Sequence, residues 1–204
     1  MAIDLAAVLE PSHTAVITSE LEQGVVGEAS ALPQLAEAAQ GGVIDNAARL
    51  CAGARRVGAQ VVHCVATRRP DGKGSNANCR LFQAVRRSDM PLVPGTSAVA
   101  VVPELGPEAG DLVLSRLHGL NPMAGTDLDP VLRNLGVTTL VVTGVSVNVA
   151  VTNLVMDAVN RSYQVVLPRD AVAGIPADYA NAVIDNTLSL LATVTTTDAV
   201  LAAW

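Results

Sequence analysis

Aromatic residues and lysine are scarce in this chain of 204 residues, which has one tryptophan, two tyrosines, one phenylalanine and Lys73 as its only lysine. Thirteen Lys plus Arg residues against nineteen Asp plus Glu residues give a formal net charge of −6 at pH 7. No basic run is longer than a pair. Proteins that bind nucleic acid usually carry a basic stripe, and those that bind single strands add aromatic side chains on which bases stack. We therefore expect no nucleic-acid partner.

Long apolar runs are also missing, although half of the residues are hydrophobic. Charged residues, Gly or Pro interrupt every apolar run well before the roughly 18 residues that a membrane span needs. The first residues lack the basic-then-apolar order of a signal peptide. We expect a cytoplasmic protein that does not enter a membrane, and a chain of this length favours a single domain over residues 1–204.

The three cysteines, Cys51, Cys64 and Cys79, follow neither a CxxC pattern nor a Cys/His spacing. A disulfide framework would need an even number of cysteines, and a structural zinc site would need such a spacing. The sequence therefore predicts three reduced thiols.

Apolar runs of strand length alternate with stretches of helical periodicity along the chain. The expected strands are residues 14–19, 60–67, 111–116, 138–144, 164–168 and 192–197. The expected helices lie within 32–58 and near 77–87, 127–135, 149–161 and 177–191. Strands that are apolar throughout and separated by helices are typical of a parallel sheet covered on both faces. This pattern predicts an α/β protein with a three-layer α/β/α, Rossmann-like fold and a central parallel sheet of about six strands.

Polar residues that directly follow the expected strands are the first candidates for a site, because ligands of open parallel sheets bind beyond the carboxyl ends of the strands. These residues are Glu20, Arg68, Arg69, Arg116, His118, the turn 146–150 and Asp170. The turn lies between a strand and a helix, where α/β enzymes often keep a nucleophile, yet GVSVNVAV (144–151) contains no cysteine. Ser146 lacks the second glycine of a nucleophile elbow, although the backbone N–H groups at the start of the helix can still bind an anion.

Three segments carry a resemblance to a known family: TAVITSELEQGVVG (14–27), GTDLDPVLRNLGVTTLVVTGVSVNVAV (125–151) and MDAVNRSYQVVLPRDAVAG (156–174). In order and spacing they resemble the isochorismatase-like superfamily of cysteine hydrolases, which includes nicotinamidases, N-carbamoyl amidohydrolases and isochorismatases. The resemblance covers almost the whole chain and implies the same α/β fold. Because the family commonly forms dimers and tetramers, it also implies a homodimer or homotetramer.

The chain departs from this family at all three catalytic positions. The resemblance places Glu20 where the family has Asp, Arg116 at the nearest match to its Lys, and Ala150 where it has the nucleophilic Cys. An alanine methyl cannot attack a carbonyl carbon, which closes the covalent amidase route at that position. Metal-binding members place Asp and His after the second strand, whereas Arg68 and Arg69 stand there in this chain. We expect no metal and no cofactor.

Isochorismatases lack the cysteine and cleave a vinyl ether, which implies a carboxylic acid that protonates the enol-ether carbon. The resemblance therefore predicts a hydrolase that acts on a small anionic metabolite, with Glu20 as the acid and Arg116 as its partner or the partner of the substrate. The candidate substrate-binding residues are Arg68, Arg69, His118, Ser146, Asn148 and Val149. The alternative is a catalytically silent member that binds a metabolite or a partner subunit, and the sequence leaves both open.

Overall fold

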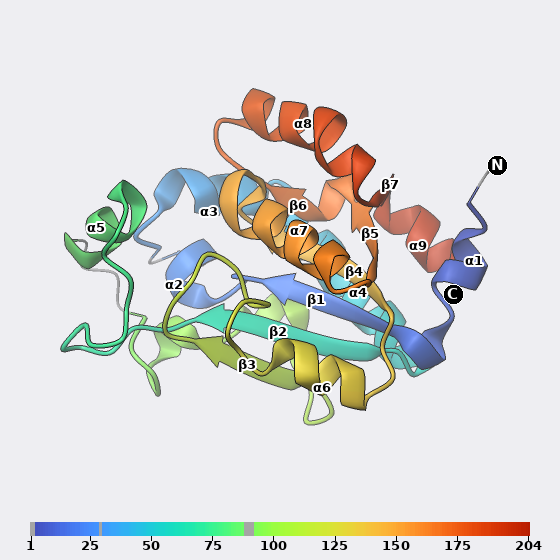
Figure 1. Ribbon diagram of the computed structural model, residues 1–204, viewed down its shortest axis with the longest axis horizontal. Helices are drawn as coiled ribbons and strands as arrows, with labels where there is room; N and C mark the ends of the chain where they lie inside the picture. Colours follow the sequence, from blue (N-terminus) through green and yellow to red (C-terminus); the bar gives the residue numbers. More distant parts are fainter. Residues whose placement is uncertain (1–2, 29, 88–91) are drawn as a thin grey trace.

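A parallel sheet forms the centre of the molecule in this computed structural model, which describes residues 3–28, 30–87 and 92–204 (Figure 1). Its strands are β1 (Thr14–Ser19), β2 (Gln60–Ala66), β3 (Leu112–Arg116), β4 (Thr139–Val145), β5 (Gln164–Pro168), β6 (Val172–Ala173) and β7 (Thr193–Thr195). The order across the sheet is β3-β2-β1-β4-β5-β7, and β6 pairs with the end of β4. Every strand pair is parallel. The prediction of a three-layer fold with a parallel central sheet is confirmed.

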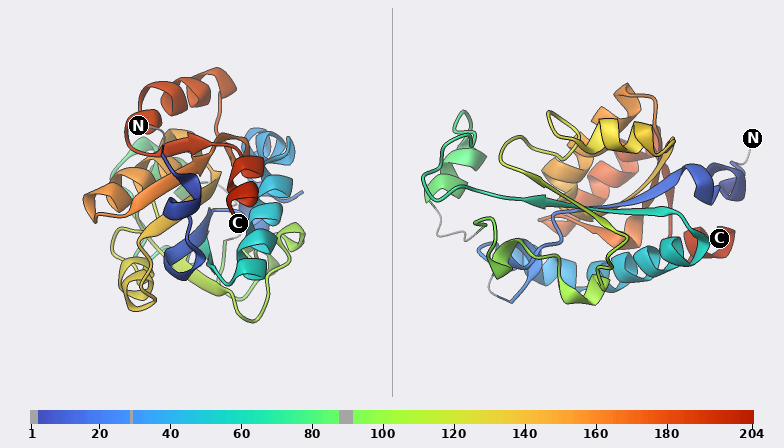
Figure 2. Two further views of the ribbon diagram at one scale, coloured as in Figure 1. Left: turned by 90° about the vertical axis from the view of Figure 1, so that its right-hand side faces the viewer. Right: turned by 90° about the horizontal axis from the view of Figure 1, so that it is seen from below.

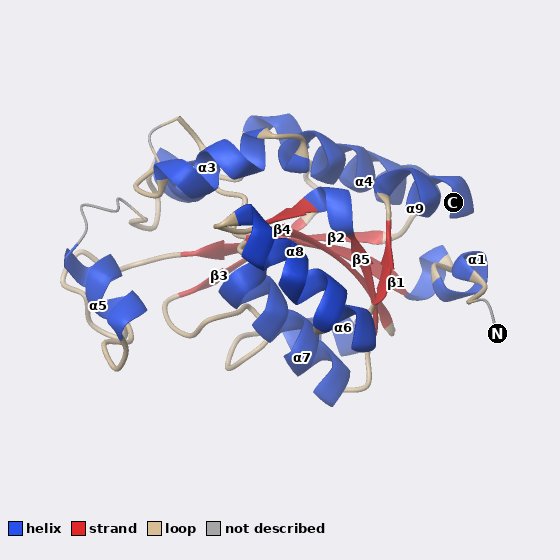
Figure 3. Ribbon diagram, turned by 90° about the horizontal axis from the view of Figure 1, so that it is seen from above, coloured by secondary structure: helices blue, strands red, loops and turns tan. Residues whose placement is uncertain are grey.

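Helices cover both faces of this sheet (Figures 2 and 3). One face packs against α3 (Pro33–Gln40), α4 (Val43–Val57) and α9 (Thr197–Ala203). The other packs against α6 (Leu128–Asn134), α7 (Thr152–Asn160) and α8 (Ala177–Asn186). The shorter elements are α1 (Leu5–Val8), α2 (Gln23–Val26), α5 (Arg80–Arg87), η1 (Pro11–His13), η2 (Ser97–Val99), η3 (Pro103–Leu105), η4 (Val147–Val151), η5 (Arg169–Ala171) and η6 (Leu188–Leu190).

Burial explains why the central strands are apolar along their whole length. Every residue of β1 and of β4 is buried, because helices cover both faces and strands flank both edges. The edge strand β3 differs, since its residues alternate in exposure and Val113 is 54% exposed. An apolar run in the sequence therefore does not show whether a strand lies at the centre or at the edge of the sheet.

Two expected helices are divided in the structure. The helical stretch within 32–58 is α3 and α4, separated at Gly41 and Gly42. Gly42 has φ 109°, a left-handed conformation that a right-handed helix cannot continue through. The stretch 177–191 is α8 followed by the short turn η6.

No helix in the described ranges is long and apolar enough to cross a membrane. The homodimer or homotetramer stays a prediction.

Candidate active site

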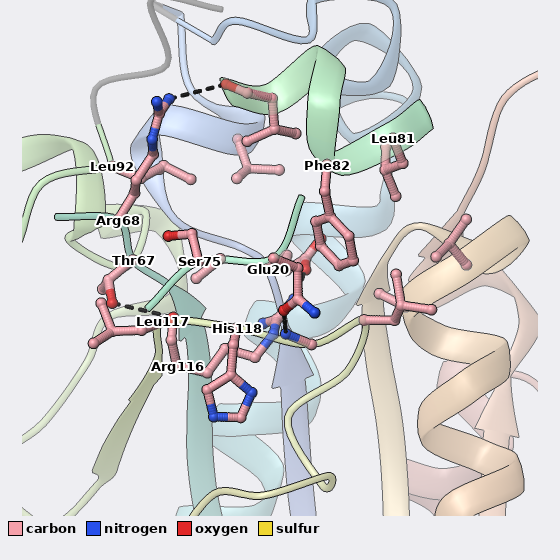
Figure 4. Close-up of a pocket in the computed structure, with 18 of the residues that line it drawn as sticks. Glu20, Thr67, Arg68, Ser75, Leu81, Phe82, Leu92, Arg116, Leu117 and His118 are labelled. Carbon is pink, nitrogen blue, oxygen red and sulfur yellow. Dashed lines mark hydrogen bonds and ion pairs between the residues drawn. The ribbon is translucent and has the colours of Figure 1, made fainter. Parts of the chain in front are cut away.

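A pocket of about 190 Å³ opens where β1, β2, β3 and β4 end (Figure 4). The strand order reverses direction between β1 and β4, and the crevice at such a reversal is the usual ligand site of open α/β sheets. Each of the four strands delivers residues to the lining: Glu20 after β1, Ala66 and Thr67 at the end of β2, Arg116 and Leu117 at the end of β3, and Ser146, Val149 and Ala150 after β4.

Glu20 and Arg116 form an ion pair in this pocket, with Arg116 Nη2 donating to Glu20 Oε1. Their side chains are only 18% and 6% exposed. Burial acts to lower the pKa of Arg116, but the adjacent Glu20 carboxylate outweighs it, and the pKa is raised. Of the atoms in the described residues, none accepts a hydrogen bond from Arg116 Nη1, which is buried. The Arg116 guanidinium is therefore charged, the pair is largely shielded from water, and one donor group of Arg116 stays unused among the described residues.

The backbone at the strand ends explains why the two side chains meet. Ala66 and Arg116 are partners in the register of β2 and β3, and the Arg116 carbonyl accepts hydrogen bonds from Thr67 N at 2.8 Å and Thr67 Oγ1 at 3.1 Å. Glu20 has φ 55°, a left-handed conformation that is uncommon for a side-chain-bearing residue. Its N–H still donates to the Cys64 carbonyl at 3.0 Å. The chain thus leaves the sheet immediately after β1, with Glu20 in the pocket.

The last part of β4, just before the turn, contains a glycine that no other residue can replace without strain. Gly144 has φ 108°, and a Cβ there would lie 2.1 Å from the Ser19 carbonyl oxygen. Ser146 and Ala150 line the pocket beyond this turn. The Ser146 carbonyl accepts hydrogen bonds from Val149 N at 3.2 Å and Val151 N at 3.0 Å. These two N–H groups are therefore occupied within the turn, which weakens the expectation of an anion site made of backbone groups here.

The remaining sequence candidates divide into residues at the pocket and residues elsewhere. Arg68, His118, Ser146 and Val149 line it, and His118 is exposed. Arg69 is exposed, pairs with Asp71 and is not among the lining residues that the structure describes. Asn148 also lies outside the lining, because its amide group donates to the Ile175 carbonyl and holds the turn against the segment after β6.

Helix α5 forms an outer wall of the pocket, in the region where the sequence predicts a short helix near 77–87. Its apolar residues Leu81, Phe82 and Val85 line the pocket, and Figure 4 shows Phe82 extending from α5 toward Glu20. Arg68 secures the last turn of the helix by donating to the carbonyls of Val85 at 2.9 Å and Arg86 at 3.0 Å. Arg68 is thus engaged with backbone rather than free to bind a ligand.

Sequence reasoning missed Glu22, which is fully buried two residues after Glu20. Its Oε1 accepts a hydrogen bond from Ala66 N at 3.0 Å. Burial, with a further contribution from the charge of Glu20, raises the pKa of Glu22 to about 8. The available signal was a second glutamate only two residues after Glu20, in the segment LEQGVV (21–26) that follows a buried strand.

A network of buried polar side chains lies away from the pocket, on the face of the sheet covered by α4. Thr18 Oγ1 lies 2.9 Å from His63 Nδ1, and His63 Nε2 lies 3.3 Å from Asp111 Oδ2. Arg55 of α4 pairs with the same carboxylate at 2.7 Å. Burial lowers the pKa of His63. The network joins α4 to β1, β2 and the start of β3, and none of its members lines the pocket among the residues described.

The pocket, as the described residues line it, contains neither a cysteine nor a cluster of metal-ligating side chains. Cys51 and Cys64 are buried, burial raises the pKa of each to about 12, and Cys79 is exposed. None of the three is among the described residues that line the pocket. In the same described part of the chain, no group of three or more His, Cys, Asp or Glu residues is placed to hold a metal ion.

The fold and the strand-end pocket define a three-layer α/β/α protein with a candidate ligand site at the carboxyl ends of its parallel strands, and comparison with known sequences identifies the family. The sequence model of the isochorismatase domain matches residues 14–199. The chain belongs to the isochorismatase family.

Similar proteins include ureidoacrylate amidohydrolase RutB from Methylorubrum extorquens, which is 37% identical over 152 residues, covering 68% of this chain and 61% of that protein. RutB from Rhizobium rhizogenes is 28% identical over 84% of this chain and 74% of that protein. Among solved structures, a cysteine hydrolase from Pseudomonas syringae pv. phaseolicola superposes with a TM-score of 0.84 at 26% identity, over 96% of this chain and 93% of that one. The match to the Methylorubrum protein thus spans less than two thirds of that relative's length.

Proposed function

We propose that this chain is a hydrolase that cleaves a small anionic metabolite in the pocket at the ends of β1 to β4, without a cysteine nucleophile. The observation that carries the proposal is the buried Glu20–Arg116 pair in that pocket. It supplies a carboxyl group and a cation beside Ala150, whose methyl group cannot form a covalent intermediate. Such a pocket favours acid catalysis over nucleophilic attack by the protein.

Arg116 is the group that we assign to the anion. Its Nη1 has no hydrogen-bond partner among the described residues, and a guanidinium can bind a carboxylate through two parallel hydrogen bonds. The apolar side chains of Leu81, Phe82, Val85 and Leu92 line the same pocket and suit an uncharged body on the substrate. Ureidoacrylate, in the name of the RutB relatives, is itself a small carboxylate, which supports an anionic ligand.

The proposed reaction begins when the substrate carboxylate displaces Glu20 from Arg116. Glu20, now without its cationic partner, takes one proton from solvent and acts as the general acid. It donates that proton to the enol-ether carbon, and water adds to the resulting oxocarbenium ion and returns a proton to Glu20. The hemiketal then breaks its carbon–oxygen bond to give a carbonyl compound and an alcohol. Water is consumed, and Glu20 ends protonated. It releases that proton to solvent when the product leaves and its ion pair with Arg116 forms again.

Glu20→Gln tests the acid role, since glutamine keeps the shape of the side chain but has no acidic proton. We expect turnover to fall by about 10²- to 10⁴-fold, the contribution typical of a general acid. Binding of small carboxylates should be retained or tightened, because Arg116 then lacks a competing carboxylate. Glu37→Gln, on the exposed face of α3, is the matched control and should change neither turnover nor carboxylate binding.

The substrate is found first by a thermal-shift panel of small carboxylates, amides and carboxylated enol ethers, because ligand binding raises the melting temperature even without turnover. Turnover is then followed for each compound that binds. Unchanged turnover in Glu20→Gln would eliminate Glu20 as the acid. Binding without turnover of any compound would favour the alternative of a catalytically silent member, for which the Glu20–Arg116 pair is a structural strut.

Ala150→Cys returns a thiol to the turn after β4. We expect no rapid hydrolysis of amides or ureido acids by this variant, because Arg116 cannot give up a proton and Glu20 is one methylene longer than the family's Asp. The triple change Glu20→Asp, Arg116→Lys, Ala150→Cys is expected to give weak hydrolysis, measured as ammonia release. Rapid ammonia release by Ala150→Cys alone would show that Glu20 and Arg116 do not prevent amide hydrolysis, contrary to this prediction.

A further inference from the structure

Glu22 is an enclosed carboxyl group directly behind the pocket. Its residue is 0% exposed, and its Oε1 accepts one hydrogen bond, from Ala66 N at 3.0 Å. Its Oε2 is buried with no hydrogen-bond partner in the described residues. An ionised carboxylate in such a place normally accepts several hydrogen bonds or pairs with a cation of its own. The backbone N–H groups of Ala66 and of Glu22 itself favour the ionised form, but burial outweighs both, so Glu22 cannot remain charged at low cost.

The charges around Glu22 reinforce this point. Among the residues that the structure describes, the titratable groups that act on it are Glu20 from the segment after β1, Cys64 from β2 and Arg116 from β3. Arg116 is the one cation in that set, and it already pairs with Glu20. Two ionised carboxylates beside one guanidinium would leave the buried group with a net negative charge, whereas a protonated Glu22 leaves it neutral.

We propose that Glu22 is a positioning residue for the anion subsite: it stays protonated when the protein works, and so leaves the charge of Arg116 available to an anionic substrate. This inference rests on the proposed function, in which Arg116 receives the substrate's anion. Glu22 does not line the pocket and takes no part in the chemical step.

A dependence of ligand affinity on pH follows from the proposal. The pKa of Glu22, raised by burial to about 8, places its ionisation just above neutral pH. Once ionised, Glu22 competes for Arg116 and repels an incoming anion. By linkage, if the bound anion raises the pKa of Glu22 by about one unit, the anion binds about tenfold more weakly when Glu22 is ionised. Cys64, with a pKa of about 12, stays neutral through this range.

The test measures the dissociation constant of benzoate by titration calorimetry from pH 7 to pH 9.5, with neutral benzamide as the uncharged probe. In the unaltered protein we expect benzoate to bind about tenfold more weakly at pH 9.5 than at pH 7, and benzamide to bind equally at both. Glu22→Gln keeps the acceptor for Ala66 N and cannot ionise, so its affinity for benzoate should match the unaltered protein at pH 7 and stay constant to pH 9.5. Glu37→Gln, exposed on α3, should keep the full pH dependence.

Infrared spectroscopy gives a second measurement that needs no ligand. The unaltered protein should show the carbonyl band of a protonated carboxylic acid at pH 7 that disappears near pH 8 and is missing in Glu22→Gln. If that band is present but benzoate affinity keeps the same pH dependence in Glu22→Gln, Glu22 does not act on the anion and the proposal is wrong. If the band is missing at pH 7, Glu22 is ionised and the proposal is equally wrong. If neither benzoate nor any other carboxylate binds at any pH, the pocket is not an anion-binding site, and the proposed function is wrong.

Discussion

Arg116→Met is expected to lower the free energy of unfolding by about 3 kcal/mol and to abolish carboxylate binding. Removing one partner of a buried ion pair typically costs about 3 to 5 kcal/mol, because the other charge is left buried without compensation. Glu20 keeps a side-chain exposure of 18%, which argues for the lower end of that range. Methionine has a similar length and no charge, so the loss reports on electrostatics more than on packing. Urea unfolding at pH 7 measures the change.

A double-mutant cycle separates the ion pair from other effects of the substitution. In Glu20→Gln/Arg116→Met the remaining carboxylate is gone, so the double variant should be more stable than Arg116→Met alone. Arg116→Lys keeps a positive charge and should lose less stability than Arg116→Met. Additive losses in the cycle would mean that Glu20 and Arg116 are not coupled, and carboxylate binding by Arg116→Met would remove Arg116 as the anion-binding group.

The central sheet could be predicted from the sequence because its strands obey one rule. Strands such as TAVITS and TTLVVTG are apolar without alternation, which is typical of a parallel sheet covered on both faces, and both strands are completely buried in the structure. The short β6 escaped prediction because Val172 and Ala173 form only two residues of strand inside the turn-rich segment DAVAG. The break between α3 and α4 depends on the left-handed φ of Gly42, and the Gly41–Gly42 pair was the sequence signal for it, because a Gly-Gly dipeptide marks a turn.

From the sequence, a site residue could be predicted only where its place at the end of a strand determines its position. Glu20 follows β1 and Arg116 ends β3, and β2 separates these two strands, so topology places both residues at the same end of the sheet without making them neighbours. Their ion pair depends on side chains that meet across the end of β2. Arg68 and Arg69 are neighbours in sequence, yet Arg68 lines the pocket and donates to carbonyls of α5, whereas Arg69 is exposed and pairs with Asp71, a difference that depends on three-dimensional contacts. Glu22 was missed for a related reason: the carboxyl is enclosed by the ends of β1 and β2, and that enclosure depends on three-dimensional packing.

The pH dependence of stability gives the second large effect, and Glu22 is its source. The native pKa of about 8 lies above the ordinary value of 4.5, so the folded protein binds more protons than the unfolded chain between these values. The free energy of unfolding therefore falls as the pH rises through that interval. At 1.36 kcal/mol per pKa unit the loss is roughly 5 kcal/mol, as an upper bound for so buried a group.

Glu22→Gln should remove this loss, because an amide at the same place has no proton to release. Urea unfolding at pH 5, 6.5, 8 and 9 is expected to show the unaltered protein losing several kcal/mol from pH 5 to pH 9 relative to Glu22→Gln. His63 works in the opposite direction: burial lowers its pKa, so the stability that its neutral form provides is present above the unfolded value of 6.5 and is lost as the pH falls below it. The contribution of His63 is the same in the unaltered protein and in Glu22→Gln, so it cancels in the difference between their free energies of unfolding. The control Glu37→Gln should have the stability of the unaltered protein at every pH. Parallel stability curves for the unaltered protein and Glu22→Gln would show that Glu22 is ionised in the folded state, whatever the affinity of the pocket for anions.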